Sequence, residues 1–283
     1  MKLRTTLALA MLFCLVAAAP ADAIVRGANS TDPDGLRTFV VRIESDLGEM
    51  CTGVLIDDDL ILTAAHCLLA RARYSVFGLD RRFQTIRREA IAAALHPTFE
   101  AGVPPRRQPG ADIAVLRIDA PFGRQFRSMP LVPLARPMEG EDVTIAGFGT
   151  TAFGRRNSAR VLRYTYLRLR GEIRMGNTVL MGSDSERNSE RAGAGACQGD
   201  SGGPILRGDP GTYGLIGLVS WSSGATGETG RTACGGSTAI TPIAPHLDWI
   251  AARSRELRAI NGVNTSMPRP GTGRGSEWQD WAQ

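Results

Sequence analysis

Short apolar runs separated by turn residues recur along most of the chain. Each run either alternates apolar with polar positions or is continuously apolar over a few residues, and both patterns are typical of β-strands. The strands predicted in this way cover residues 36–44, 52–56, 60–63, 75–77, 113–118, 142–148, 161–169, 205–206, 213–221 and 237–243. Because no helix pattern alternates with them and no internal repeat is visible, the chain is predicted to be all-β, a sandwich or a barrel.

The best helical pattern lies in residues 245–260. Leu247, Ile250 and Leu257 recur there at helical spacing, the segment begins with a proline, and Asn-Gly follows it. Residues 263–283 are rich in Gly, Pro, Ser and Thr and are predicted to form a flexible C-terminal tail.

The N-terminus has the pattern of a secretory signal peptide. Lys2 and Arg4 precede an apolar run over residues 7–19, and Ala-Asp-Ala at 21–23 supplies the small residues of a cleavage site. The run is too short to span a membrane comfortably, and no later segment is apolar for long enough. We therefore expect residues 1–23 to be removed and the remaining chain to be secreted (to the periplasm if the source is bacterial), without a stable membrane anchor.

The composition is that of an ordinary globular protein, with 43% hydrophobic and 22% charged residues over 283 positions. The basic residues behind the net charge of +5 are arginines apart from Lys2, and they are scattered rather than gathered in a stripe with aromatic residues. Nucleic acid is therefore not an expected partner.

The cysteines indicate disulfide bonds. Of the five, Cys14 lies in the leader, and those that remain are Cys51, Cys67, Cys197 and Cys234. An even number of cysteines in an exported chain is typical of a disulfide-bonded protein. Zinc is the competing interpretation, but the sequence lacks a C-x-x-C pair, and residues 77–89 offer few oxygen ligands for calcium. No metal and no cofactor is expected.

Residues 195–204, Gly-Ala-Cys-Gln-Gly-Asp-Ser-Gly-Gly-Pro, are the strongest candidate for chemistry. The glycines permit a tight loop that aims backbone N–H groups at one point beside the hydroxyl of Ser201. A serine becomes a good nucleophile when a base takes its proton, and a histidine base needs a carboxylate to orient it. His66, at the end of an apolar run, and Asp112, directly before an apolar strand, are the candidates, although each alone also fits a purely structural role.

The motifs T-A-A-H-C around His66, D-I-A-V-L from Asp112 and G-D-S-G-G-P around Ser201 occur in this order along the chain. In this combination the chain from residue 24 to about 260 resembles the trypsin/chymotrypsin family of serine proteases. The resemblance implies two six-stranded antiparallel β-barrels, with the active site between them and a C-terminal helix. It also implies a protease domain over residues 24–262, in which His66 is the general base, Asp112 orients it and Ser201 is the nucleophile.

The resemblance implies further roles around this triad. The backbone N–H groups of Gly199 and Ser201 would form the oxyanion hole. The Ser220 hydroxyl would bond the catalytic carboxylate, and the backbone at Trp221 would pair with the substrate as an added β-strand.

In this family a freed N-terminal amine pairs with the aspartate before the serine, which here implies Ile24 and Asp200. The cleavage site at 21–23 directly precedes Ile24, so that export alone would generate the active enzyme. Cleavage after Ala21 would instead leave a dipeptide to be trimmed. The disulfides that the resemblance implies are Cys51–Cys67 and Cys197–Cys234.

The resemblance places Gly195, followed by Ala196, at the base of the specificity pocket, where trypsin-like members carry an aspartate. Gly236 matches a glycine of the pocket wall. An uncharged base predicts cleavage after neutral residues, aliphatic or aromatic, rather than after Arg or Lys. The segment 222–233 is longer than usual and contains Glu228, which either folds into the pocket and supplies a charge or lies in a solvated loop.

Two other functions compete with that of a serine endopeptidase. Catalytically silent family members that act as binding proteins usually lack a triad residue, and all three are present here. An esterase or lipase would carry G-x-S-x-G on an α/β sheet, with the histidine after the serine. The expected partners are protein or peptide substrates and protein inhibitors, and the chain is expected to be a monomer.

Overall fold

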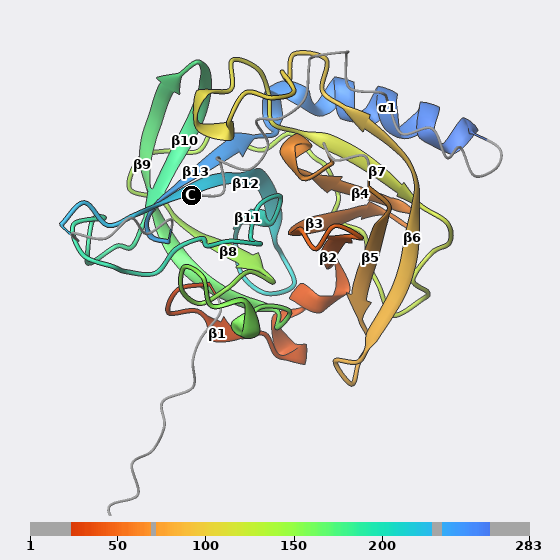
Figure 1. Ribbon diagram of the computed structural model, residues 1–283, viewed down its shortest axis with the longest axis horizontal. Helices are drawn as coiled ribbons and strands as arrows, with labels where there is room; N and C mark the ends of the chain where they lie inside the picture. The colour runs from red at the N-terminus through yellow and green to blue at the C-terminus, as the bar shows by residue number, and fades with distance from the viewer. Residues whose placement is uncertain (1–23, 69–71, 228–233, 261–283) are drawn as a thin grey trace, which may run out of the picture.

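The structure, a computed structural model, describes residues 24–68, 72–227 and 234–260. Two β-barrels lie side by side in it (Figure 1). In the first barrel neighbouring strands are antiparallel, and the order β2-β3-β4-β7-β6-β5 closes on itself. Its strands are β2 (Val40–Ser45), β3 (Met50–Asp57), β4 (Leu60–Thr63), β5 (Tyr74–Leu79), β6 (Thr85–Leu95) and β7 (Ala114–Ile118).

The second barrel is built from the later strands and is also antiparallel. Its order is β9-β10-β13-β12-β11-β8, and β8 pairs back onto β9 to close the ring. The short strand β1 (Ala28–Asn29) adds to β9 from outside the ring. The strands are β8 (Asp142–Gly147), β9 (Arg163–Met175), β10 (Asn177–Ser183), β11 (Pro204–Arg207), β12 (Gly214–Gly224) and β13 (Gly235–Pro242).

A shared apolar core fixes the two barrels against each other. All residues of β4 are buried, so the side chains that alternate between its two faces are covered on both sides of the sheet, in which the strand pairs with β3 and β7. The core of the first barrel continues into Phe148, Leu206 and Leu218 of the second. Removal of apolar surface from water is the main force behind such packing, so the boundary between the barrels is a rigid place on which to build a site.

The helix α1 (Leu247–Ala259) follows the last strand of the second barrel and lies across the first barrel, over β6 and β7 (Figure 1). Arg117 of β7 donates from Nη1 to the carbonyls of Leu257 (2.9 Å) and Ile260 (2.7 Å) at the end of the helix. A cation at this position satisfies free carbonyl groups and complements the helix dipole. The helix therefore ties the end of the chain to the first barrel.

The predicted fold class is confirmed, and the predicted helix is present with slightly narrower bounds. Three details differ from the prediction. Leu36–Thr38 forms a 3-10 turn before β2, and β9 extends to Met175. The strands β1, β6 and β10 were not predicted. β6 is rich in alanine and arginine, which favour helices, and its pairing with β5 and β7 imposes the strand.

Several predictions concern residues that the structure does not describe. The leader 1–23, the tail 263–283 and Glu228 lie outside the described residues. Among the helices of the described ranges, none is long and apolar enough to cross a membrane.

Two of the three histidines form a cluster at the junction of α1 with the first barrel. His246 Nδ1 lies 3.2 Å from Nε2 of His96, which follows β6, and the His96 ring packs against Trp249 of α1 with 4.8 Å between centroids. Burial, together with the neighbouring His96, lowers the pKa of His246 to about 4, and burial also lowers the pKa of His96. Both rings are therefore neutral at pH 7, and protonation opposes their packing.

We predict that acid weakens the protein through this cluster. The unfolded chain binds a proton at His246 near pH 6.5, whereas the folded chain does so only near pH 4, so stability is lost as the pH falls through this window. The His246→Gln variant, which does not titrate, should lose about 1–2 kcal/mol less than the wild type between pH 6.5 and 4.5. Thermal or urea unfolding of both proteins at several pH values measures the difference, and parallel pH profiles would contradict it.

Candidate active site

The pairing of β4 with β7 brings His66 and Asp112 together. His66 lies in the 3-10 turn Ala65–Leu68 that follows β4, and Asp112 lies just before β7. Because Thr63 at the end of β4 is opposite Ala114 at the start of β7, the flanking residues meet. His66 Nδ1 is 2.7 Å from Asp112 Oδ2, and the His66 backbone N–H donates to Asp112 Oδ1 at 3.0 Å. The carboxylate thus fixes both the ring and the backbone of the histidine.

A residue of the second barrel completes the surroundings of this carboxylate. Ser220 of β12 donates from its hydroxyl to Asp112 Oδ2 at 2.6 Å, and Asp112 is fully buried. Burial by itself would raise the pKa of Asp112, but the charge and hydrogen bonds of His66 and the bond from Ser220 outweigh it and hold the pKa below its usual value. Asp112 is therefore held in its ionised form.

Ser201 lies beside this pair, in the loop that leads to β11. Its carbonyl accepts a hydrogen bond from the Thr52 N–H of β3 at 2.8 Å. The sulfur of Cys67 lies 3.8 Å from the Ser201 carbonyl oxygen and 3.8 Å from His66 Nε2. One sulfur atom therefore contacts both the serine and the histidine, which come from different barrels.

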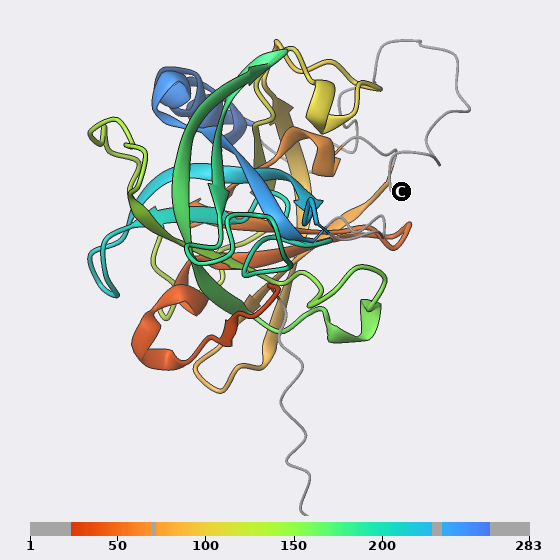
Figure 2. The same cartoon turned by 90° about the vertical axis from the view of Figure 1, so that its left-hand side faces the viewer.

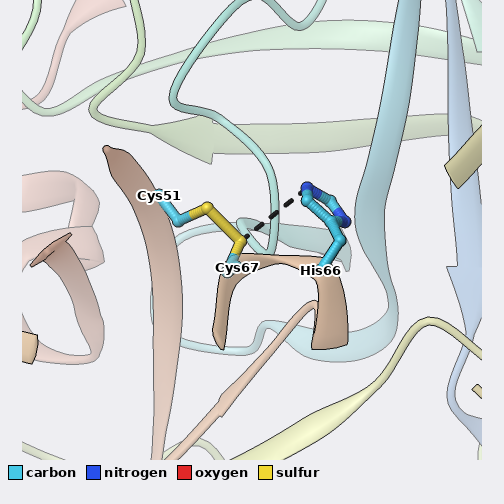
Figure 3. Close-up of side chains that lie close together, drawn as sticks. All are labelled: Cys51, His66 and Cys67. Carbon is cyan, nitrogen blue, oxygen red and sulfur yellow. Dashed lines mark hydrogen bonds between the residues drawn. A yellow bond between two sulfur atoms is a disulfide. The ribbon is translucent and has the colours of Figure 1, made fainter. Parts of the chain in front are cut away.

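Figure 3 shows the histidine ring next to the disulfide that joins Cys51 and Cys67. One nitrogen or sulfur atom from each of these three residues lies within 4.8 Å of the others, a spacing that suits a metal ion. The sulfurs are bonded to each other, however, and offer no thiolate to a metal. The cluster is therefore a crosslink that supports the turn carrying His66. The second predicted disulfide, Cys197–Cys234, is also present.

The serine loop presents two backbone donors. Gly199 has φ +95°, and a side chain there would lie against Met50 and only 3.0 Å from the Gly149 Cα, so glycine is required. The Gly199 carbonyl accepts a bond from Thr52 Oγ1 at 2.8 Å, which fixes the orientation of the peptide. Within the described part of the chain, neither the Gly199 N–H nor the Ser201 N–H donates a hydrogen bond. Both remain available to an oxyanion.

Asp200, between these donors, is fully buried beneath the loop. Its carboxylate accepts hydrogen bonds from the backbone N–H groups of Gly149 (2.8 Å) and Cys197 (2.9 Å). Burial raises the pKa of Asp200 to about 7, against the lowering effect of these bonds and of the Arg163 charge. The loop is therefore built around a buried carboxylate whose ionised form a further cation would favour.

Ile24 is fully buried in the core of the second barrel, which also contains Ala196 and Ile205 from either side of the serine loop. The next residue, Val25, forms an isolated bridge to Gly195, with N–H to carbonyl distances of 3.1 and 3.3 Å. The structure thus brings the segment at residue 24 to the start of the serine loop.

The predicted pocket residues lie together. A Cβ atom built on Gly195 would lie 3.6 Å from the Gly236 carbonyl oxygen and 3.6 Å from Thr238 Oγ1, so the space beside Gly195 borders a neutral carbonyl and a hydroxyl. Ala196 is held by a bond from its N–H to the same Thr238 hydroxyl at 3.1 Å. Asp184, which precedes the serine loop, accepts bonds from three backbone N–H groups.

Thr52 is a functional residue that sequence reasoning missed. Its N–H and its hydroxyl hold the carbonyls of Ser201 and Gly199, and its hydroxyl also accepts from the Phe148 N–H at 3.1 Å. The prediction placed it only in a strand. The signal that points to it is its position directly after Cys51, whose disulfide brings it beside His66.

A family model, described as Trypsin, matches residues 24–250 of this sequence. The chain belongs to the trypsin family. Among curated trypsin-family proteins, granzyme M from Rattus norvegicus is 29% identical over 232 residues, which cover 76% of this chain and 83% of that protein. Kallikrein-8 from the same species is 30% identical over 174 residues, which cover 56% of this chain and 62% of that protein.

Solved structures of the trypsin family have the same fold. Mouse neuropsin superimposes with a TM-score of 0.63 at 24% identity, covering 82% of this chain and 100% of that chain. A mutant of human heparin binding protein superimposes with a TM-score of 0.63 at 20% identity, covering 85% of this chain and 99% of that chain. These structures show that the chain has the fold of that family. The family match, with granzyme M and kallikrein-8 as relatives, identifies the chain as a trypsin-like serine endopeptidase.

We predict that Ser220→Ala impairs the enzyme without unfolding it. The variant removes the hydroxyl bond to Asp112, so the carboxylate is held less firmly and its pKa rises. A hydrogen bond to a charged group contributes about 1.5–3 kcal/mol, which sets an expected loss of about 10- to 100-fold in kcat/KM. Peptide hydrolysis measures the loss. The control Ser75→Ala removes a serine hydroxyl of β5 that bonds to Glu89 at 3.2 Å; equal activities of the two variants would contradict the role of Ser220.

Proposed function

We propose that this chain is a secreted serine endopeptidase that hydrolyses peptide bonds through His66, Asp112 and Ser201. One observation carries the proposal. Ser220, Asp112 and His66 form a continuous hydrogen-bonded chain, and the Cys67 sulfur that touches His66 also touches Ser201. A carboxylate that orients a histidine beside a serine is the arrangement that activates a serine nucleophile.

The residues take the following steps. His66 Nε2 accepts the hydroxyl proton of Ser201 while Oγ attacks the carbonyl carbon of the scissile bond. The carbonyl oxygen becomes an anion and accepts hydrogen bonds from the N–H groups of Gly199 and Ser201. Asp112 stabilises the imidazolium, which then protonates the leaving amine as the acyl-enzyme forms. Water, deprotonated by His66, attacks the ester and releases the second product.

The pocket residues support a preference for neutral residues directly before the scissile bond. The atoms nearest to the Cβ position of Gly195 are the Gly236 carbonyl, the Thr238 hydroxyl and the Gly235 Cα. A carbonyl and a hydroxyl provide no charge to hold Arg or Lys, and the glycine and alanine at the proposed pocket base add none. Aliphatic and aromatic residues are the proposed preference.

The test is a panel of reporter peptides with Ala, Val, Leu, Phe or Arg before the scissile bond. The wild type, with Ile24 as its first residue, should cleave after neutral residues. Ser201→Ala should lower turnover by about 10⁶-fold, because without its nucleophile the enzyme cannot form the acyl intermediate. Cleavage mainly after Arg would contradict the neutral pocket, and unchanged cleavage by the Ser201→Ala variant would contradict the mechanism.

Activation belongs to the same proposal. Residues 1–23 form a leader, residues 24–262 the protease domain and residues 263–283 a tail. Removal of the leader frees the amine of Ile24, and this amine pairs with Asp200. The raised pKa of Asp200, about 7 when the chain continues before Ile24, supports the need for such a cation.

Protein inhibitors and a monomeric state are also proposed.

We predict that the enzyme loses most of its activity when Asp22 and Ala23 remain in front of Ile24. A chain that begins at Asp22 places the amine too far from Asp200 and should be about 100- to 4000-fold less active than one that begins at Ile24, since breaking a buried ion pair costs about 3–5 kcal/mol. Trimming the dipeptide should restore activity. The Asp200→Asn variant of the chain beginning at Ile24 should be as inactive as the blocked chain, that is, the chain whose first residue is Asp22. Equal activity of the chains beginning at Asp22 and Ile24 would contradict this activation.

The same pair predicts a pH signature. In the blocked chain the folded-state pKa of Asp200 lies near 7, above its unfolded value, so stability is lost as the pH rises from about 4 to about 7. The free amine offsets this loss in the chain beginning at Ile24. The melting temperatures of the blocked chain and of the chain beginning at Ile24, measured by thermal unfolding, should therefore diverge as the pH rises across this range.

A further inference from the structure

Arg106 lies over an aromatic ring of the candidate active site. Its guanidinium carbon is 4.6 Å from the centre of the Trp221 ring, and its side chain is exposed. Trp221 directly follows Ser220, the residue that bonds Asp112. The stacked pair therefore lies at the edge of the site, one residue along β12 from the hydrogen-bonded chain.

The loop that carries Arg106 is held in place by a buried amide. Gln108 is fully buried, accepts from the Glu100 N–H at 2.8 Å and donates to the carbonyls of Glu100 (3.0 Å) and Val103 (3.2 Å). These three bonds cross the base of the loop. The 3-10 turn Pro105–Arg107 is thus presented on a fixed support, as a binding group requires.

The second barrel supports the same loop from its other side. Asn177, at the start of β10, donates from its N–H to the Gln108 carbonyl at 3.1 Å and from its side chain to the Gly110 carbonyl at 2.7 Å. Figure 2 shows the tip of the β9–β10 hairpin beside the turn at Pro105–Arg107. The loop and the hairpin therefore form one continuous wall.

This wall carries positive charge. Arg106 and Arg107 are both exposed, and in the described ranges neither forms an ion pair with a carboxylate, including that of Glu100 on the same loop. Arg174 of β9 lies close to the hairpin turn, and Glu172 of that strand is paired with Arg136. Among the described residues, no neighbouring acid therefore pairs with the positive charge beside Trp221.

We propose that Arg106 and Trp221 form a subsite for a carboxylate, which selects substrates with Asp or Glu two to four residues before the scissile bond. Stacking on Trp221 uses the face of the Arg106 guanidinium. The N–H groups at the edge of the guanidinium remain available for a bidentate hydrogen bond to a carboxylate. The inference rests on the proposed function and on the expected pairing of the substrate backbone with the backbone at Trp221, which brings the residues before the scissile bond past this side chain.

The test compares peptides that differ at one position, with Glu, Gln or Lys placed two, three or four residues before a neutral cleavage residue. The wild type should show a kcat/KM about three- to tenfold higher for Glu than for Gln at one of these positions, with Lys the poorest. The preference should weaken with added salt, because the subsite is exposed. Arg106→Gln should abolish it, and Arg106→Lys should keep only part of it.

The matched control is Arg255→Gln, which removes the same charge from an exposed position on α1. This variant should keep the full preference for Glu. Loss of the preference in Arg255→Gln as well would show a general charge effect and overturn the subsite. Equal kcat/KM for Glu and Gln at all three positions in the wild type would also overturn it.

A binding measurement separates this inference from the proposed function. Fluorescence anisotropy with the Ser201→Ala variant reports the affinity for the same labelled peptides without turnover. Tighter binding of the Glu peptide, lost on Arg106→Gln, supports the subsite even if the wild type cleaves none of the peptides, a result that would instead overturn the proposed function. Equal binding of Glu and Gln peptides overturns the subsite alone.

Discussion

The buried carboxylate of Asp112 is the interaction on which the site depends. It accepts hydrogen bonds from the His66 backbone at 3.0 Å, the His66 ring at 2.7 Å and the Ser220 hydroxyl at 2.6 Å. The first two come from the first barrel and the third from the second. A buried charge is tolerated only when donors surround it, so this carboxylate requires the barrels to keep one relative position. That requirement also sets where the histidine ring points.

A second buried carboxylate, Asp200, plays the corresponding part for the serine loop. Asp112 is held by charge and hydrogen bonds that lower its pKa, whereas burial raises the pKa of Asp200 to about 7. The donors around Asp112 outweigh its burial, whereas the two backbone donors of Asp200 and the Arg163 charge do not outweigh the burial of that carboxylate. In the proposed mechanism Asp112 orients His66 at all times, whereas Asp200 orders the serine loop only after the amine of Ile24 has been freed. Thr52 couples the two regions, because it belongs to the first barrel and holds two carbonyls of the serine loop.

The sequence was informative where chemistry restricts the choice of residue. His66, Asp112 and the segment around Ser201 could be identified because few residue types can do this work, and the paired cysteines followed from the family resemblance. β6 could not be predicted, since its alanines and arginines adopt a strand only through their neighbours. The partners of Thr52 and Arg106 were equally hidden, because a hydrogen bond or a stacking contact between distant segments leaves no local pattern.

In the proposed mechanism, Ser201 is a nucleophile activated by His66 in the chain that begins at Ile24. The most direct test is reaction with a fluorophosphonate, which phosphonylates an activated serine, followed by intact-mass measurement and peptide mapping. We expect one adduct per chain, located on Ser201, and a reaction slower by orders of magnitude in the His66→Ala variant. A folded chain that begins at Ile24 and stays unlabelled at Ser201, or that labels equally fast without His66, would contradict this mechanism.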